Sequence, residues 1–245
     1  MSRMPAAKRR EQLLDTAAKL FATQGYAGAT TSQIARTAGV TEPIIYRHFA
    51  SKRELFIALI ERTGEDTIKL WEHELSSAPE PAERIKRLIR ANPMVTHKSG
   101  SGRGVYRVII QAMTEVEDPS ILEAVTKHIY MLHGFLSEEI RKGQESGQVP
   151  QKFSPEVTAW ALIHLGLGYG TLSAMGLSGH GIDQRGNHVQ DLIGELMLGD
   201  RYRAAAAAAP APAAPDAPGA NGAAPGGGPA PSGDRAPGAP ASPPF

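Results

Sequence analysis

Three helix-start signals lie close together near the N-terminus, and their spacing constrains the fold more than any other feature of the chain. Residues 30–33 (TTSQ) and 51–54 (SKRE) both have the form S/T-x-x-E/Q, in which the first side chain accepts from a first-turn amide and the fourth reaches back. Between them, Thr41 comes two residues before Pro43, and a proline is tolerated in the first turn of a helix. Gly39 can adopt the positive φ of a tight turn. The segment therefore predicts two short helices around a turn, followed by a third helix.

Along the rest of the chain, apolar residues recur with the helical period, and no segment alternates convincingly with a period of two. We therefore expect an all-α fold. A first helix should end at about Gly25, and the helix that opens at Ser51 should extend to about Leu75. A Gly/Ser-rich loop is expected over residues 97–104. Further helices are expected over residues 81–91, 105–117, 119–147, 155–176 and 187–198, which gives about nine in all.

The charges of the chain are unevenly distributed. Residues 1–62 contain ten lysines and arginines but only five acids, a net charge of +5, whereas the whole chain carries +1. A basic N-terminal segment on a mildly acidic body indicates a polyanionic partner at one end, although a solvated charged face has the same composition.

Several classes of site are excluded or disfavoured by composition. The chain has no cysteine, so disulfides, thiolate metal sites and cysteine nucleophiles are excluded. The motifs GxxxxGK[ST], HExxH and GxSxG are missing, so we expect neither an enzyme nor a cofactor. The N-terminal residues MSRMPAAKRREQLL lack the apolar core of a signal peptide, which favours a cytoplasmic protein.

Two long segments are unusual in composition. Residues 204–245 are almost entirely Ala, Pro and Gly, with too little to bury to offset the entropy of ordering, so we expect a disordered tail. Residues 157–182 contain no Lys, Arg, Asp or Glu, and their length could span a bilayer. However, this segment holds two His, two Ser, two Thr and six Gly, which favours a helix buried among other helices over a membrane span.

The two short helices around Gly39 have the pattern of a helix-turn-helix. Ala35 is small enough for the helices to approach each other. Apolar residues that should pack the second helix against the first helix of the chain are Ile34, Val40, Ile45 and Phe49, facing Leu14, Ala17 and Phe21. The second helix then projects as a rod, the geometry that fits the major groove of DNA.

The joint spacing of these residues resembles a known family. Residues 25–56 read G-Y-x-x-A-T-T-S-Q-I-A-x-x-A-G-V-T-x-x-x-I-Y-x-H-F-x-S-K-x-x-L-F, which is similar to the DNA-binding domain of the TetR family of bacterial repressors. The resemblance implies a DNA-binding domain over residues 1–50 and a helical body over residues 51–203. That body would bind an effector and form a homodimer through its last two helices. Double-stranded DNA would be the partner, in a nucleoid-associated protein of the bacterial cytoplasm.

The resemblance implies that several polar residues meet the phosphate backbone of DNA. Thr30, Thr31 and Ser32 would sit by a phosphate, where free amides, hydroxyls and the helix dipole favour an anion. Tyr46 and Lys52 resemble phosphate contacts of the family. Simpler roles remain open for three of them: a helix cap for Thr30, half-buried packing for Tyr46 and a solvated charge for Lys52.

The second helix of the motif would face the bases. Arg47 and His48 would lie against the backbone or a base edge, and Glu42, Pro43 and Ile44 occupy positions that reach into the groove. The family often places Lys, Arg, Ser or Gly where Glu42 and Pro43 stand. A carboxylate is repelled by phosphates, so we expect Glu42 to accept from a cytosine amino group or merely to complement the helix dipole.

Candidate residues in the body are less specific. Residues expected to face the interior, where they line an effector site or simply form core, are Trp71, Tyr106, Ile110, Met113, Tyr130, His133 and His164. Gly166 and Gly170 share one face of a helix, and their cost of ~1 kcal/mol each relative to alanine suggests a close helix contact. We expect that contact across a dimer axis, with packing inside the chain as the alternative.

Together these features predict a ligand-responsive transcriptional regulator. As a homodimer it would bind an inverted-repeat operator, act as a repressor and be released by a small, apolar effector. The alternative is a ligand-independent DNA-binding adaptor or architectural protein with the same fold.

Overall fold

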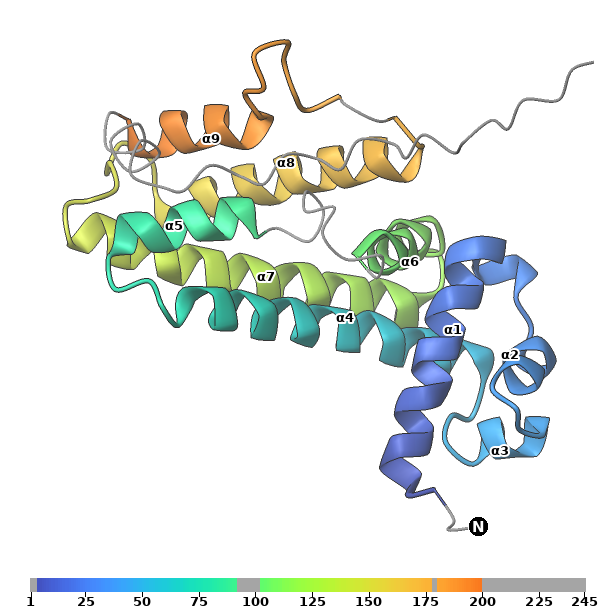
Figure 1. Ribbon diagram of the computed structural model, residues 1–245. Coiled ribbons are helices and arrows are strands. Elements are labelled where there is room, and N and C mark those ends of the chain that lie inside the picture. Colours follow the sequence, from blue (N-terminus) through green and yellow to red (C-terminus); the bar gives the residue numbers. More distant parts are fainter. Residues whose placement is uncertain (1–3, 92–101, 178–179, 200–245) are drawn as a thin grey trace, which may run out of the picture. The chain divides into compact units, whose positions relative to one another are not determined.

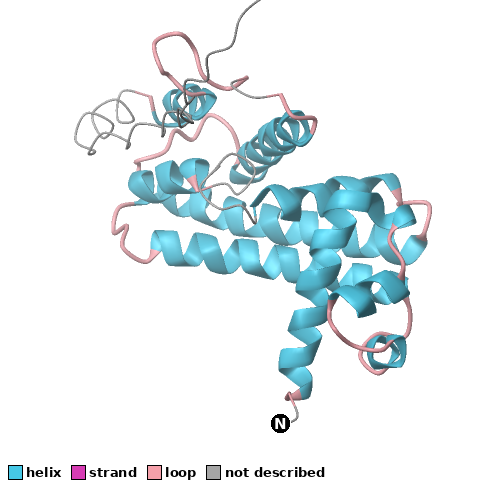
Figure 2. Cartoon of the chain, turned by 45° about the vertical axis from the view of Figure 1, so that its right-hand side comes forward, coloured by secondary structure: helices cyan, strands magenta, loops and turns pink. Residues whose placement is uncertain are grey.

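The fold is all-α, as the sequence predicts, in the part that the computed structural model describes, residues 4–91, 102–177 and 180–199 (Figures 1 and 2). The expected tail over residues 204–245 and most of the expected loop over residues 97–104 lie outside that part. Apart from an isolated bridge between Ile182 and His188, the described backbone is helix, turn or loop. Its helices are α1 (Ala6–Gly28), α2 (Thr31–Thr37), α3 (Glu42–Tyr46), α4 (Lys52–Leu75), α5 (Pro81–Arg90), α6 (Gly102–Thr114), α7 (Pro119–Glu145), α8 (Pro155–Ala174) and α9 (Val189–Leu198).

The helix ends follow the local signals, with three differences. Thr30 and Gln33 form the full predicted capping box, but Thr41 precedes α3 without a hydrogen bond from its side chain. The Ser51 hydroxyl caps α4 as expected, whereas the Glu54 carboxylate reaches back to the amide of Ala50 at 2.6 Å. The predicted end of α1 at Gly25 is a kink, with φ of 79°, after which the helix continues for one more turn.

Buried side chains form two apolar clusters. The first joins α1, α2 and α3 to the first half of α4, to α6 and to the start of α7, and its largest members include Phe21, Phe49 and Phe56. The second lies among the later halves of α4 and α7 and helices α5, α8 and α9, around Trp71 and Leu136. Because α4 and α7 pack side by side and contribute to both clusters, they connect the helix-turn-helix to the body (Figure 1).

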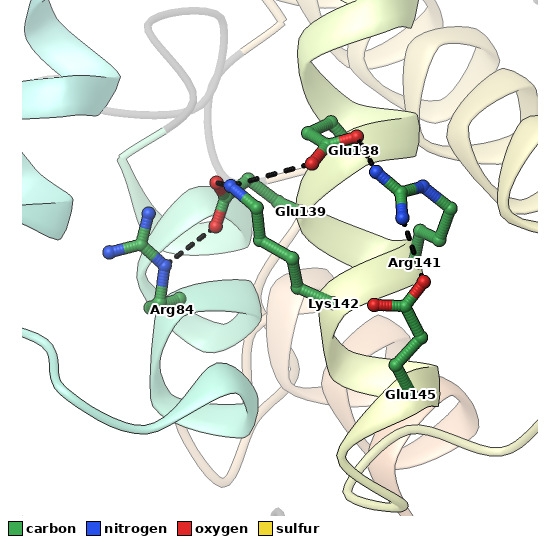
Figure 3. Close-up of polar contacts among 6 residues, drawn as sticks. All are labelled: Arg84, Glu138, Glu139, Arg141, Lys142 and Glu145. Atoms are coloured by element: carbon green, nitrogen blue, oxygen red, sulfur yellow. Dashed lines mark hydrogen bonds and ion pairs between the residues drawn. The ribbon is translucent and has the colours of Figure 1, made fainter.

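Helices α5 and α7 are joined by an ion pair within their interface. The Glu139 side chain of α7 is buried and accepts from Nε of Arg84 at 2.6 Å and from Nζ of Lys142 at 2.9 Å (Figure 3). On the outer side of the same helix, Arg141 pairs with Glu138 and Glu145, and all three side chains are exposed.

Helix α8 is only partly buried, in contrast to the sequence prediction. Its inward positions are covered, but Val157, Leu165 and Leu172 are exposed on the opposite side. Within the described residues, no helix combines the length and the hydrophobicity that crossing a membrane requires.

Candidate nucleic-acid interface

The turn between α2 and α3 is fixed by backbone hydrogen bonds. Gly39 has φ of 68°, and its amide and that of Val40 donate to the carbonyls of Arg36 and Ala35, at 3.2 and 2.9 Å. Nε2 of Gln12 on α1 donates to the Ala38 carbonyl at 3.2 Å, which ties the turn to the first helix. The angle between the two short helices is therefore set by backbone contacts on both sides of Gly39.

Packing leaves one side of α3 facing solvent. Ile45 and Phe49 are fully buried in the first cluster, and the guanidinium of Arg10 lies over the Phe49 ring at 4.9 Å. Tyr46 is 51% exposed, and Arg47 is also exposed. The buried residues thus orient the helix so that Tyr46 and Arg47 face solvent.

Three polar side chains of α2 and α3 contact one another at this surface. The Thr31 hydroxyl donates to Oε1 of Glu42 at 2.5 Å and lies 3.2 Å from the hydroxyl of Tyr46. The Tyr46 hydroxyl in turn donates to the same Oε1 at 3.5 Å. Glu42 therefore has protein partners that the sequence reasoning missed, because its two expected roles involved only a base or the helix dipole.

The other residues predicted to meet DNA surround this group. Thr30, Ser32 and Pro43 are exposed, and Thr30 is engaged with Gln33 in the capping box. Ile44 and His48 are half-buried. The structure thus places the predicted residues of α2 and α3 on neighbouring elements.

Lys52 is bound within the chain. Its Nζ donates to the carbonyls of Tyr26 at 2.9 Å and of Ala29 at 3.2 Å, and lies 4.4 Å from the centre of the Tyr26 ring. The ammonium group therefore holds the kinked end of α1 against the start of α4. An ammonium has three donors, so one remains for a phosphate.

Replacing Lys52 by methionine is expected to lower the free energy of unfolding by about 1–3 kcal/mol, because two carbonyls lose a charged donor. Thermal or urea unfolding measures this loss. The matched control is Lys69→Met, since Lys69 forms only exposed pairs with Glu65 and Asp66 on its own helix. Equal effects of the two substitutions would contradict a structural role for Lys52.

Polar contacts join α1 to the body. Nη1 of Arg62 on α4 pairs with Glu11 and Asp15 of α1 at 3.0 and 2.9 Å. From α6, Arg107 donates to the carbonyls of Ala22 on α1 and Ala174 on α8, at 3.3 and 3.2 Å. The first helix is thereby held to α4 and α6 through side chains as well as through its apolar face.

A cavity of about 300 Å³ lies among α4, α5, α7, α8, α9 and the segment before α9. Its lining is mainly leucine, isoleucine and valine, with the rings of Trp71 and Tyr169. Polar groups come from His164, His180 and Gln190, and no described lining residue is Lys, Arg, Asp or Glu. Burial raises the pKa of Tyr169, whose ring lies 4.5 Å from that of His180.

Comparison with known proteins identifies the family of this chain. The model of the bacterial regulatory proteins of the tetR family matches residues 13–59, which span most of α1, all of α2 and α3 and the start of α4. The nucleoid occlusion factor SlmA of Marinobacter nauticus is 30% identical over 151 residues, which cover 62% of this chain and 74% of SlmA. The chain belongs to the TetR family.

Further relatives agree with membership of the TetR family. The transcriptional activator FasR of Mycolicibacterium smegmatis is 33% identical over 90 residues, 37% of this chain and 41% of FasR. The structure of a regulator from Saccharomonospora viridis in complex with choline has a TM-score of 0.64 at 23% identity, over 80% of this chain and 96% of that one. It shares the fold. FasR and the Saccharomonospora viridis protein are named transcriptional regulators, a class without catalysis. This TetR-family chain carries the DNA-binding helix-turn-helix of the family.

The predicted effector residues of this TetR-family protein are only partly brought together. Trp71 and His164 line the cavity. Met113 instead packs against the first cluster, and Ile110, on the same helix, is half-buried. Tyr130 is 61% exposed, so its expected interior position is wrong. His133 is half-buried, with Nε2 3.1 Å from the carbonyl of Glu156. The side chain of Tyr106 lies outside the described residues.

Other residues of the cavity escaped the sequence reasoning. The apolar positions of α5 and α9 have the pattern of ordinary core. Only the packing of these two helices against each other shows that, with α8, they border a cavity. Gly166 and Gly170 are buried on the inward side of α8, and Gly166 lines the cavity. These two positions therefore face the interior of the chain, not the exposed apolar side of α8.

Proposed function

We propose that this TetR-family regulator binds an inverted-repeat operator as a homodimer, acts as a repressor and leaves DNA when a small apolar molecule occupies the cavity. The observation that carries the proposal is the exposed face of α2 and α3, where Thr31, Tyr46 and Arg47 lie on a motif that packing holds rigid. The net charge of +5 over residues 1–62 favours the approach of this end of the chain to DNA. Thr30, Ser32, Pro43, Ile44, His48 and Lys52 complete the proposed DNA-binding surface.

Arg47 is the residue of this surface most suited to a phosphate. It is exposed, and its side chain forms no ion pair or hydrogen bond among the described residues. Arg47→Ala is expected to weaken binding to all DNA sequences and to reduce the slope of log affinity against log salt by about one per protomer. Fluorescence anisotropy over a salt series measures both. A changed sequence preference with an unchanged slope would place Arg47 on a base edge instead.

The proposed dimer surface is the outer side of α8 and α9. Exposed apolar residues on these helices are Val157, Leu165, Leu172, Leu192 and Leu196. A helix that is apolar on all sides is normally buried all round, and all of α8 after Glu156 lies within the 26 uncharged residues from 157 to 182. A second copy of the chain would cover this side of the helix. In this proposal, residues 1–50 form the DNA-binding domain, and residues 51–203 form the body that binds the effector and dimerises.

The effector class follows from the lining of the cavity. A charged ligand would lose its hydration without gaining an oppositely charged partner from the described lining, so a neutral, largely apolar molecule fits best. His164, His180 and Gln190 would bind one polar end of it. Leu165 and Leu172 belong both to the lining and to the exposed face, so a bound molecule could alter how two copies pack.

Selection of genomic fragments by the purified protein tests the proposal. The expected result is enrichment of an inverted repeat, bound by a dimer in sedimentation experiments and released by at least one neutral apolar compound. Failure to enrich any sequence would contradict operator binding.

A second function is favoured by one relative. The SlmA protein, which this chain matches over 74% of its length, is named a nucleoid occlusion factor. A ligand-independent DNA-binding adaptor would keep the reading surface and use the body for a protein partner. Dispersed genomic sites from which no compound releases the protein would favour this function.

A further inference from the structure

The hydroxyl groups of Thr31 and Tyr46 both face the Glu42 carboxylate, and their oxygens lie 3.2 Å apart. Each hydroxyl has one proton to donate, and Oε1 of Glu42 lies 2.5 Å from the Thr31 oxygen and 3.5 Å from the Tyr46 oxygen. A phosphate oxygen of DNA is an acceptor of the same kind as a carboxylate oxygen. While Glu42 accepts these protons, neither hydroxyl can donate to a phosphate.

We propose that Glu42 is an internal competitor for the phosphate-binding hydroxyls, and that this competition lowers the affinity of the protein for DNA that is not its operator. The proposal deepens the proposed function and rests on DNA binding through α2 and α3. To contact the phosphate backbone of any DNA, the hydroxyls of Thr31 and Tyr46 must first break their hydrogen bonds to Glu42. The carboxylate then remains close to phosphates, where its negative charge is repelled.

The base sequence determines whether Glu42 regains a donor. Glu42 lies in the first turn of α3, and a carboxylate at a base edge can accept from the amino group of cytosine. At a site with a cytosine in the right place, the hydroxyls bind phosphate, and the cytosine amino group donates to the Glu42 carboxylate in their place. At other sites the carboxylate has no replacement donor. A sequence-neutral phosphate contact thereby becomes dependent on the base sequence.

The test measures affinity for two duplexes, the selected operator and a scrambled duplex of equal length and composition. Glu42→Gln keeps the size of the side chain and removes its charge, whereas Glu42→Ala removes the acceptor as well. Both are expected to bind scrambled DNA more tightly, by about tenfold for the alanine variant, while operator binding improves less or weakens. The ratio of the two affinities therefore falls.

The control removes a negative charge elsewhere on the first four helices. Glu11→Gln keeps Arg62 paired with Asp15 and lies on α1, in contact with the body. It should change affinity for scrambled DNA much less than Glu42→Gln, because its charge does not face the proposed surface. Thermal unfolding of every variant confirms that the helix-turn-helix is intact.

A double-mutant cycle with Tyr46→Phe isolates the competition from simple charge repulsion. In the wild-type background, loss of this hydroxyl should barely change affinity for scrambled DNA, since the Tyr46 hydroxyl already donates its proton to Glu42. In the Glu42→Ala background the same change should weaken binding by about fivefold. Equal costs in both backgrounds would overturn the proposal, as would unchanged or weaker binding of scrambled DNA by both Glu42 variants.

These outcomes are separable from failure of the proposed function. A wild-type protein with no preferred sequence would contradict operator binding, but its affinity for scrambled DNA would still report on the competition. Conversely, a wild-type protein with a clear operator and no response to Glu42→Ala on scrambled DNA would overturn only the role of Glu42.

Discussion

Replacing Arg84 by methionine is expected to lower the free energy of unfolding by about 3 kcal/mol, the low end of the cost of breaking a buried ion pair. The Glu139 side chain is 4% exposed and accepts from Nε of Arg84 at 2.6 Å. Methionine fills a similar space but leaves this carboxylate oxygen without its donor. Lys142 still binds the other oxygen at 2.9 Å, which limits the loss.

The same pair gives the stability of the protein a defined pH dependence. Burial raises the pKa of Glu139, but hydrogen bonds and charge from Arg84 and Lys142 outweigh burial and hold it below its ordinary value of 4.5. A lowered pKa contributes stability that is present above pH 4.5 and is lost as the pH falls through the folded-state value. In Arg84→Met this acid-sensitive contribution should shrink.

Arg141→Met is the matched control on the opposite side of α7. Arg141 forms two ion pairs, with Glu138 and Glu145, but its side chain is 46% exposed and theirs are exposed as well (Figure 3). Exposed pairs contribute at most about 1 kcal/mol, so this variant should unfold nearly as the wild type does. Urea unfolding at neutral pH measures both variants. A loss for Arg141→Met as large as that for Arg84→Met would show that burial is not the cause.

The features of the fold that were predictable from the sequence depend on residues close together in the chain. The cap formed by Thr30 and Gln33, the positive φ of Gly39 and the cap of α4 by Ser51 each follow from a few neighbouring residues. Helical periodicity placed the longer helices for the same reason. These signals survive because the tertiary structure agrees with them.

The features that were not predictable depend on distant partners. Lys52 binds carbonyls that lie more than 20 residues earlier in the chain, and Glu42 binds a hydroxyl of the preceding helix. Periodicity gave Tyr130 an inward position, but the residue is exposed, with its ring 5.7 Å from that of Trp160. Neighbouring residues cannot specify such contacts, because the relative placement of whole helices decides them.

The second large effect expected is at His128, which lies on the side of α7 that packs against α4. The ring is 2% exposed and faces Gly64, where an added Cβ would come within 2.8 Å of Nδ1. Neither ring nitrogen has a well-formed hydrogen bond among the described residues. Burial lowers the pKa of His128 from 6.5 to about 4, and the nearby carbonyl of Ile60 only partly opposes this.

The sign of the resulting pH dependence follows from proton uptake. Below pH 6.5 the unfolded chain protonates this histidine, whereas the folded chain keeps it neutral down to about pH 4. The contribution of His128 to the free energy of unfolding is therefore fully present above pH 6.5. It falls by about 3 kcal/mol between pH 6.5 and 4 and levels off below that.

His128→Leu should remove that slope. Leucine leaves no buried polar atom, so the variant is expected to be about as stable as the wild type at neutral pH and more stable than it at pH 5. Unfolding curves over a pH series measure the difference, and His73→Leu, at an exposed position on α4, is the control that should keep the wild-type slope. Parallel pH profiles for wild type and His128→Leu would contradict the argument.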